Sequence, residues 1–133
     1  MDRSRRSNCP ISFALDLIGD KWSLLVLRDV ILLNRRYYKE FLEAGEGIAT
    51  NILADRLKTH EQAGLITKKA DALDRKKYVY RPTQKALDML PAMVEIVLWG
   101  AKYDPQTAAP SDAIKKIRRN RDEYIQKIRA NFT

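Results

Sequence analysis

Several residue types that carry chemistry in other proteins are scarce in this chain. Its 133 residues include one cysteine, Cys9, and one histidine, His60. A single cysteine excludes a disulfide within the chain and a cysteine-rich metal site. No metal-spaced cluster, glycine-rich phosphate loop or nucleophile–histidine pair with supporting spacing occurs either. We therefore expect no metal, no cofactor and no catalytic centre, and we predict that the protein is not an enzyme.

Long apolar runs are also missing. None reaches the ~18 residues that a membrane-spanning helix needs, although hydrophobic residues make up 45% of the chain. The first seven residues are basic, but the apolar stretch and cleavage site of a signal peptide do not follow them. We therefore expect a cytoplasmic protein without a membrane partner. Its length suits one domain with one modest core.

Negative charge is in deficit. The chain has 25 lysines and arginines against 17 aspartates and glutamates, so its formal net charge is +8. A small domain this basic has a polyanion as its obvious partner. Many basic proteins nevertheless bind nothing anionic, so the position of the charge is more informative than its sum.

Hydrophobic periodicity predicts a mainly helical chain with one hairpin. A helix of period 3.6 is expected over each of the ranges Ile11–Ile18, Lys21–Leu33, Tyr38–Glu43, Thr50–Ala63, Thr83–Tyr103 and Ser111–Asn131. Strands are expected at Leu65–Ala70 and Lys77–Pro82. Asp20 and Thr50 can cap the helices that follow them, and Pro91 is expected to kink the longest helix.

The segment from Tyr38 to Thr83 follows a known plan. A short helix, a glycine-rich turn, an amphipathic helix and a basic hairpin succeed one another there. This order is typical of a winged helix-turn-helix, with the helix-turn-helix at 38–63 and the wing at 65–82. The predicted fold class is therefore mainly α (α+β), a winged helix-turn-helix with a two-stranded β-hairpin wing and flanking dimerisation helices.

The helix that starts at Thr50 has the two faces that DNA reading requires. Its polar side holds Asn51, Asp55 and Lys58, opposite a side with Leu53 and Leu57. A major groove about 12 Å wide admits one such helix. Asparagine can bond twice to adenine, lysine can reach a phosphate or guanine, and aspartate can accept from cytosine or repel other bases. An ordinary solvated helix face would look the same. The candidate reading residues are Thr50, Asn51, Ala54, Asp55 and Lys58.

The hairpin concentrates positive charge beside this helix. From Leu65 to Lys85 there are seven positive and two negative residues, a net charge of +5. A lysine-rich edge strand that resists aggregation would also be basic. The cluster Arg75-Lys76-Lys77 at the turn instead favours contact with phosphates or the minor groove. Ahead of the helix-turn-helix, a second group of cations is a candidate phosphate clamp, formed by Arg35, Arg36 and Lys39.

Several segments resemble the HxlR-type regulators, which are relatives of the MarR group. The opening signature of that family is similar to Cys9-Pro10 followed by residues 14–29, which read ALDLIGDKWSLLVLRD. Its recognition-helix segment is similar to Gly47-Ile48, Leu53, Arg56-Leu57-Lys58, Glu61 and Gly64-Leu65-Ile66. Its strand-to-helix junction resembles Tyr80–Thr83, and its dimer-helix pattern resembles Leu90-Pro91 with Trp99.

The resemblance covers about Cys9 to Trp99 and carries functional expectations. It implies a bacterial homodimer that binds a pseudo-palindromic operator in double-stranded DNA, with repression as the default mode. It places an HxlR-type core at 7–104 within a single domain of residues 1–133, which ends in an extra helix at 111–131. It also implies thiol-based sensing through the cysteine near the N-terminus, as in several members.

Cys9 is the candidate sensor residue. It precedes a helix start and follows Arg3, Arg5 and Arg6, and both positive charge and a helix N-terminus favour the reactive thiolate. A small electrophile is therefore a candidate ligand. The alternative is an inert small hydrophobe that is half-buried.

Three further expectations concern packing and partners. The first helix and the last two carry more apolar surface than a small core can bury, so we predict that they form the dimer interface; alternatively, the last helix folds back onto its own subunit.

His60 is expected to be a hydrogen-bonded core histidine, and Arg28 and Asp29 a buried pair. The alternative function is a winged-helix module for RNA or protein, although charge at the hairpin argues against a protein interface.

Overall fold

The computed structural model describes residues 6–132. Eight helices and two strands are assigned in this part of the chain. In chain order they are α1 (Pro10–Ile18), α2 (Lys21–Ile31), α3 (Tyr38–Leu42), α4 (Thr50–Gln62), β1 (Ile66–Ala70), β2 (Tyr78–Pro82), α5 (Gln84–Leu87), α6 (Leu90–Tyr103), α7 (Ser111–Arg119) and α8 (Arg121–Ala130). The predicted order of a helix-turn-helix followed by a hairpin is confirmed.

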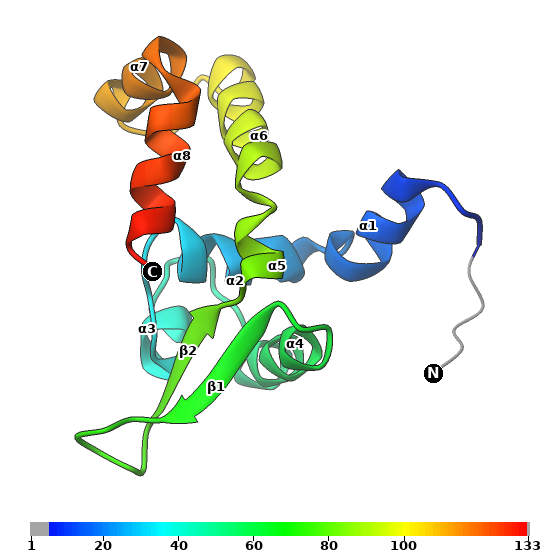
Figure 1. Ribbon diagram of the computed structural model, residues 1–133, viewed down its shortest axis with the longest axis vertical. Helices are drawn as coiled ribbons and strands as arrows, with labels where there is room; N and C mark the ends of the chain where they lie inside the picture. Colours follow the sequence, from blue (N-terminus) through cyan, green and yellow to red (C-terminus); the bar gives the residue numbers. More distant parts are fainter. Residues whose placement is uncertain (1–5, 133) are drawn as a thin grey trace.

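Helix α2 lies at the centre of the molecule. Figure 1 shows α3, α4 and the sheet on one side of α2, and α6, α7 and α8 on the other. Because α2 has neighbours on both sides, four of its seven apolar residues are buried, and Leu27 is completely inaccessible. Burying such a side chain contributes about 1.5–3 kcal/mol. Helix α2 is therefore the central helix of the core.

The two strands pair in antiparallel register, with Lys68 opposite Tyr80. Tyr80 points into the core, where its ring meets Phe41 of α3 edge-on at a centroid distance of 5.9 Å. The backbone N–H of Tyr80 also donates to the carbonyl oxygen of Arg36 at 2.8 Å. The segment before α3 therefore holds the wing against the helix-turn-helix.

The prediction that Thr50 caps α4 is wrong. Ala49 is the N-cap, and Thr50 is the first helical residue. The helix ends at Gln62, one residue before its predicted limit, and Gly64 beyond it has φ +75°, a left-handed conformation that glycine adopts at low cost.

The helix predicted over Thr83–Tyr103 is two helices. Thr83 caps α5, accepting from the backbone N–H of Ala86 at 3.3 Å, and α6 begins at Leu90. Pro91 lies in the first turn of α6, where its missing N–H leaves no hydrogen bond unmade. The proline therefore starts a new helix rather than kinking a continuous one.

The extra helix predicted at 111–131 is also two helices, which form a hairpin. Asn120 is extended, with φ −154° and ψ 93°, and its side chain accepts from the backbone N–H of Glu123 at 3.1 Å. Asparagine is a favoured N-cap, and Asp122 and Glu123 suit the positive end of the α8 dipole. These local preferences interrupt the longer apolar pattern.

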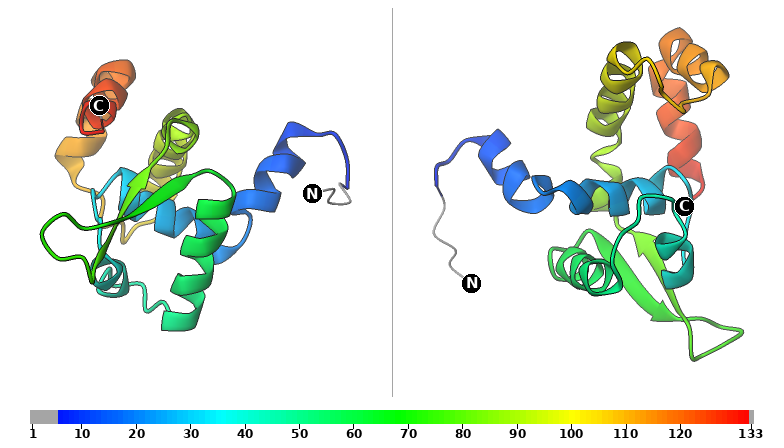
Figure 2. Two further views of the ribbon diagram at one scale, coloured as in Figure 1. Left: turned by 60° about the horizontal axis from the view of Figure 1, so that its bottom comes forward. Right: turned by 180° about the vertical axis from the view of Figure 1, so that it is seen from behind.

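The hairpin of α7 and α8 packs on its own subunit. Ile117 of α7 and Ile125 of α8 belong to the single buried core, with exposures of 2% and 5%. Helix α1 differs, because it contains no buried residue and projects to one side of the molecule (Figure 2). Among the described helices, none is long and apolar enough to cross a membrane.

Candidate nucleic-acid interface

Helix α4 presents a continuous polar face to solvent. Its opposite face buries Leu53, Leu57 and His60 against the core. Because the helical period carries the remaining positions outward, every candidate reading residue is exposed, namely Thr50, Asn51, Ala54, Asp55 and Lys58. The structure thus brings these five side chains together on one accessible surface.

The start of α4 is fixed by α3. The hydroxyl of Tyr38 donates to the carbonyl oxygen of Thr50 at 2.9 Å. This bond joins the two helices of the helix-turn-helix where the candidate reading face begins. Asn51 is the next residue, so its backbone is held by a contact from the preceding helix.

Arg56 connects the exposed polar face of α4 to the N-terminal end of α2. Its Nε lies 2.7 Å from Oδ2 of Asp20, and its Nη1 lies 2.6 Å from Oδ2 of Asp55. The negative charge of Asp55 is therefore offset by a neighbouring guanidinium. Sequence reasoning missed Arg56, because its partner Asp20 is 36 residues away along the chain.

Asp20 holds several contacts at once. It caps α2 by accepting from the backbone N–H groups of Trp22 and Ser23, as predicted, and it also accepts from the Ser23 hydroxyl. Burial pushes the pKa of Asp20 upward, but the hydrogen bonds from Ser23, Arg56 and Trp22 outweigh it and hold the pKa at about 2. The hydrogen bond that Arg56 donates to Asp20 in turn raises the pKa of Arg56. Both groups are charged at neutral pH, so the ion pair persists there.

His60 anchors the buried side of α4. Its exposure is 1%, and its Nε2 lies 2.9 Å from the carbonyl oxygen of Ser23. Burial lowers the pKa of His60, which keeps the ring neutral at pH 7. The predicted hydrogen-bonded core histidine is confirmed.

The wing carries its cations at an exposed turn. Arg75, Lys76 and Lys77 are all exposed. The turn is closed by Asp74, whose carbonyl oxygen accepts from the N–H of Lys77 at 2.9 Å and whose carboxylate accepts from the N–H of Lys76 at 3.1 Å. Three neighbouring cations therefore lie in the turn between β1 and β2.

A cleft of about 520 Å³ separates α4 from the wing. Lys58 of α4 and Lys68 of β1 both line it, together with Tyr38 and Tyr80. Glu61 of α4 lines it as well, so the cleft is bordered by two lysines and one glutamate. Sequence reasoning named Lys58 but missed Lys68 as a site residue, because Lys68 reaches the cleft only through the pairing of the two strands, which places it opposite Tyr80.

The three upstream cations do not share one environment. Arg35 directs its Nη1 to Oδ1 of Asp29 at 2.8 Å, so it is held by an internal ion pair. Arg36 and Lys39 are exposed, and Lys39 lies 3.9 Å from Glu43 of the same helix. The structure therefore leaves Arg36 and Lys39 more accessible to a phosphate than Arg35.

Asp29 is the buried carboxylate of this region. Its exposure is 4%, and its Oδ1 also accepts from Nη2 of Arg28 at 2.8 Å. Arg28 reaches Glu46 as well, with Nη1 2.9 Å from the carboxylate. Burial lowers the pKa of Arg28, but the hydrogen bonds that Arg28 donates to Glu46 and Asp29 outweigh it and raise that pKa. The pair expected between Arg28 and Asp29 is confirmed, and the network ties α2 to the turn before α4.

Cys9 stands at the exposed N-cap of α1. Its backbone N–H donates to the Ser7 hydroxyl at 3.2 Å. Arg6 lies in an ion pair with Asp16 at 2.8 Å, whereas Arg3 and Arg5 lie outside the described residues. The thiol is thus accessible. Residues 6–132 hold no acidic, histidine or cysteine cluster suited to a metal ion.

Large apolar side chains remain exposed on α1 and α6. They are Ile11, Phe13, Leu15, Ile96, Trp99 and Tyr103, with exposures between 49% and 70%. Such a concentration on two projecting helices is typical of a protein–protein interface.

Comparison with curated proteins identifies relatives over most of the chain. An uncharacterised HTH-type transcriptional regulator of Mycobacterium tuberculosis (strain ATCC 25618 / H37Rv) is 32% identical over 97 residues, which cover 73% of this chain and 60% of the relative. YdeP, an uncharacterised HTH-type transcriptional regulator of Bacillus subtilis (strain 168), is 28% identical over 71% of this chain and 73% of that protein. The chain therefore spans about 60% of the length of the mycobacterial relative.

Solved structures share the architecture. The crystal structure of PA1607, described as a candidate transcription factor, matches with a TM-score of 0.71 at 31% identity, covering 80% of this chain and 74% of that one. The reduced form of the transcriptional regulator YodB from B. subtilis matches with a TM-score of 0.60 at 23% identity, covering 76% and 99%. The predicted fold class is confirmed by these winged-helix neighbours.

The family itself follows from a match to most of the chain. A sequence model described as HxlR-like helix-turn-helix matches residues 17–108, which include every element from α2 to α6. The resemblance inferred from the sequence motifs is thereby confirmed. The protein belongs to the HxlR-like helix-turn-helix family.

Proposed function

We propose that this protein regulates transcription by binding double-stranded DNA in a sequence-specific manner, with α4 in the major groove. The exposed row of Asn51, Ala54, Asp55 and Lys58 carries this proposal, since it lies beside a cleft whose far wall is a basic wing. Base edges are read by polar side chains on such a helix, whereas lysines and arginines around it contact phosphates.

The phosphate contacts are proposed on three sides of α4. The wing tip supplies Arg75, Lys76 and Lys77, and Lys68 faces Lys58 across the cleft. Upstream, Arg36 and Lys39 are the accessible members of the predicted clamp, and Arg35 contributes to it chiefly by holding Asp29. Phosphate contacts of this kind position the protein without selecting sequence.

We further propose that the active form is a homodimer on a pseudo-palindromic operator. One α4 covers only a half-site, and a two-fold dimer covers two half-sites about one helical turn apart. The exposed apolar side chains of α1 and α6 supply a surface for such a dimer. Repression is proposed from the resemblance to the HxlR-type regulators.

Cys9 is proposed to respond to a small electrophile. Its thiol is exposed at the N-terminal end of α1. An adduct there would therefore alter a helix that we place at the dimer interface. In the addition, the thiolate sulfur forms a bond to the β-carbon of a quinone or enone. The C=C π bond breaks, its electron pair passes to the conjugated carbonyl as an enolate, and the enolate takes a proton from water. The Cys9→Ser variant should bind DNA as the wild type does but fail to be released by the compound. Release of both proteins alike would end this part of the proposal.

Selection from mixed pools tests the main proposal. Wild-type protein is incubated with random duplex DNA and structured RNA together, and the bound molecules are sequenced. We expect enrichment of duplexes that share an inverted repeat. Preferential recovery of RNA would support the alternative module for RNA, and recovery of duplexes without a shared motif would contradict sequence-specific reading.

A further inference from the structure

The hairpin of α7 and α8 lies beyond the family match, which ends at residue 108. From residue 111 to 132 the chain has seven lysines and arginines against three acidic residues. Figure 1 places the hairpin at the end of the molecule away from α4 and the wing. Most of its charge therefore lies away from the duplex that α4 is proposed to read on the same subunit.

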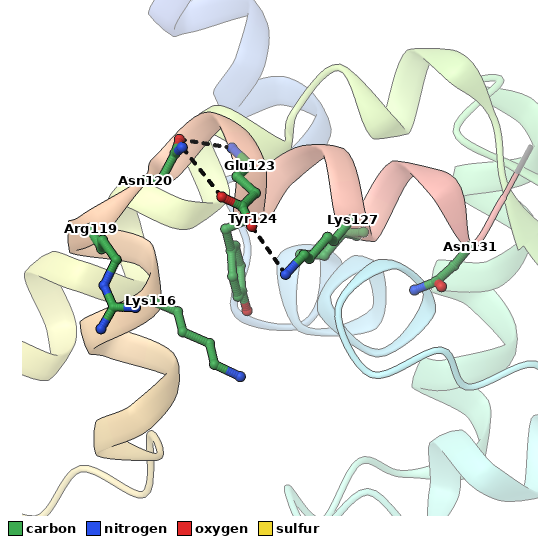
Figure 3. Close-up of a pocket in the computed structure, with 8 residues that line it drawn as sticks. Lys116, Arg119, Asn120, Glu123, Tyr124, Lys127 and Asn131 are labelled. Carbon is green, nitrogen blue, oxygen red and sulfur yellow. Dashed lines mark hydrogen bonds and ion pairs between the residues drawn. The ribbon is translucent and has the colours of Figure 1, made fainter.

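A hollow of about 440 Å³ opens between the two helices of the hairpin. Figure 3 shows the side chains that border it, with Lys116 and Arg119 on α7 and Tyr124 and Lys127 on α8. Asn120 lies at the corner between the helices. The hollow therefore combines cations from two walls with an amide and an aromatic ring.

The charges of the hollow are unevenly paired. Glu123, the acidic residue of its lining, is held by Lys127 at 3.2 Å and by the Asn120 amide at 3.4 Å. Within residues 6–132, neither Lys116 nor Arg119 has a carboxylate partner. The lining therefore keeps two positive charges that its own carboxylate does not offset.

Other arginines of the hairpin are used differently. Arg121 pairs with Glu95 of α6 at 2.5 Å, and Arg129 lies 3.8 Å from Asp88 at the end of α5. These two residues bind the hairpin to the rest of the subunit. Because that attachment involves neither Lys116 nor Arg119, the two unpaired cations are not needed for it.

We propose that this hollow binds a small ligand that carries a phosphate group. A guanidinium and an ammonium side by side provide the donors and the charge that a phosphate requires. The volume lies in the range of ordinary small-molecule sites, about 300–1,000 Å³. A second DNA duplex fits this hollow less well. The duplex is too wide to enter, so it would contact the exposed Lys115 and Arg118 as readily as Lys116 and Arg119.

Helix α7 offers a matched control for this proposal. All four cations of α7 are exposed, but Lys116 and Arg119 line the hollow and Lys115 and Arg118 do not. The double variants Lys116→Ala/Arg119→Ala and Lys115→Ala/Arg118→Ala remove equal charge from the same element. Alanine keeps helix propensity high, so both variants should fold.

Inorganic pyrophosphate serves as the probe, titrated into the full chain by calorimetry at constant ionic strength. We expect saturable binding with one site per subunit. Its affinity should fall by about tenfold or more in Lys116→Ala/Arg119→Ala, where two charge-assisted bonds are lost. It should change less than about twofold in Lys115→Ala/Arg118→Ala, where only distant exposed charge is removed.

A third double variant, Arg75→Ala/Lys77→Ala, locates any competing site. If affinity falls in this variant alone, pyrophosphate binds at the wing and the proposal is overturned. Equal losses in both α7 variants would show attraction to the overall charge of the hairpin and would overturn it too. Absence of saturable binding to the wild type would have the same consequence, while leaving the proposed reading of DNA by α4 intact.

Discussion

Arg56 shows how one side chain connects the scaffold to the proposed reading surface. It contacts Asp20 at the start of α2 and Asp55 on the exposed face of α4. With a pKa of about 2, Asp20 stays ionised throughout the neutral range, so the link does not depend on pH there. An aspartate facing DNA would repel phosphates, and the adjacent guanidinium reduces that repulsion.

His60 gives a pH-dependent prediction at the residue scale. Burial lowers its pKa below the ordinary 6.5, so below pH 6.5 the unfolded chain takes up a proton that the folded chain does not. The stabilisation is therefore complete above pH 6.5 and is lost as the pH falls toward the folded-state pKa. The free energy of unfolding, measured in urea between pH 7.5 and 5.5, should decrease over this interval.

The His60→Gln variant is the control for this pH dependence. Its amide retains a donor for the carbonyl oxygen of Ser23 but has no titration in this range. The decrease in the free energy of unfolding that His60 causes between pH 7.5 and 5.5 should be absent in the variant. An unchanged slope would show that the histidine does not cause it.

At the scale of elements, the wing has a hydrogen-bonded turn that carries exposed charge. Asp74 closes the turn through its carbonyl and its carboxylate, while the neighbouring cations stay exposed. Replacing two of these cations should therefore leave the hairpin folded and alter only its electrostatic contribution.

The Arg75→Ala/Lys77→Ala variant should weaken binding to all duplexes alike. If both side chains contact phosphates, the slope of log affinity against log salt should become shallower by about 2. Fluorescence anisotropy over a range of salt concentrations measures this slope. Lys115→Ala/Arg118→Ala removes the same charge far from α4 and should keep the wild-type slope; an equal change in both variants would contradict a specific role of the wing.

Most elements are predictable from local patterns, and the exceptions have local causes. The strands Ile66–Ala70 and Tyr78–Pro82 lie within one residue of their predicted limits, because alternation and turn residues agree there. Apolar periodicity continues across Leu90 and across Asn120, so it predicts single helices at both places. A proline in a first turn and an asparagine cap interrupt the helices despite that periodicity.

The site is less predictable than the fold, since its details depend on tertiary contacts. Helical spacing alone predicts the exposed positions Asn51, Asp55 and Lys58. The ion pair of Arg35 with Asp29, in contrast, requires the chain to turn back after α2. The contribution of Lys68 depends on the cleft between two elements, which no single pattern describes.

At the scale of the whole molecule, apolar surface is distributed unequally among the flanking helices. Helix α1 buries none of its residues, and α6 exposes Trp99 at 69%. Helices α7 and α8 bury Ile117 and Ile125 within their own subunit. This packing favours the alternative that the last helices fold back, and it leaves α1 and α6 as the proposed dimer surface.

Trp99→Lys should weaken the proposed dimer, because it places charge in an apolar interface. Sedimentation velocity at micromolar concentration should show a dimer for the wild type and a shift toward monomer for the variant. Leu73→Lys, at a wing position that is 97% exposed, is the control and should leave the dimer unchanged. A wild-type monomer at this concentration would defeat the dimer proposal.

The most direct measurement of the central claim is the DNA sequence preference of the Asn51→Ala variant, compared with that of the wild type in parallel selections from random duplexes. If α4 reads the major groove, the variant should lose its preference at one or two symmetrically placed base pairs per operator and retain it elsewhere. Arg75→Ala/Lys77→Ala, selected in the same way, should retain the whole motif at lower affinity. An Asn51→Ala motif identical to that of the wild type would contradict the placement of α4 in the groove.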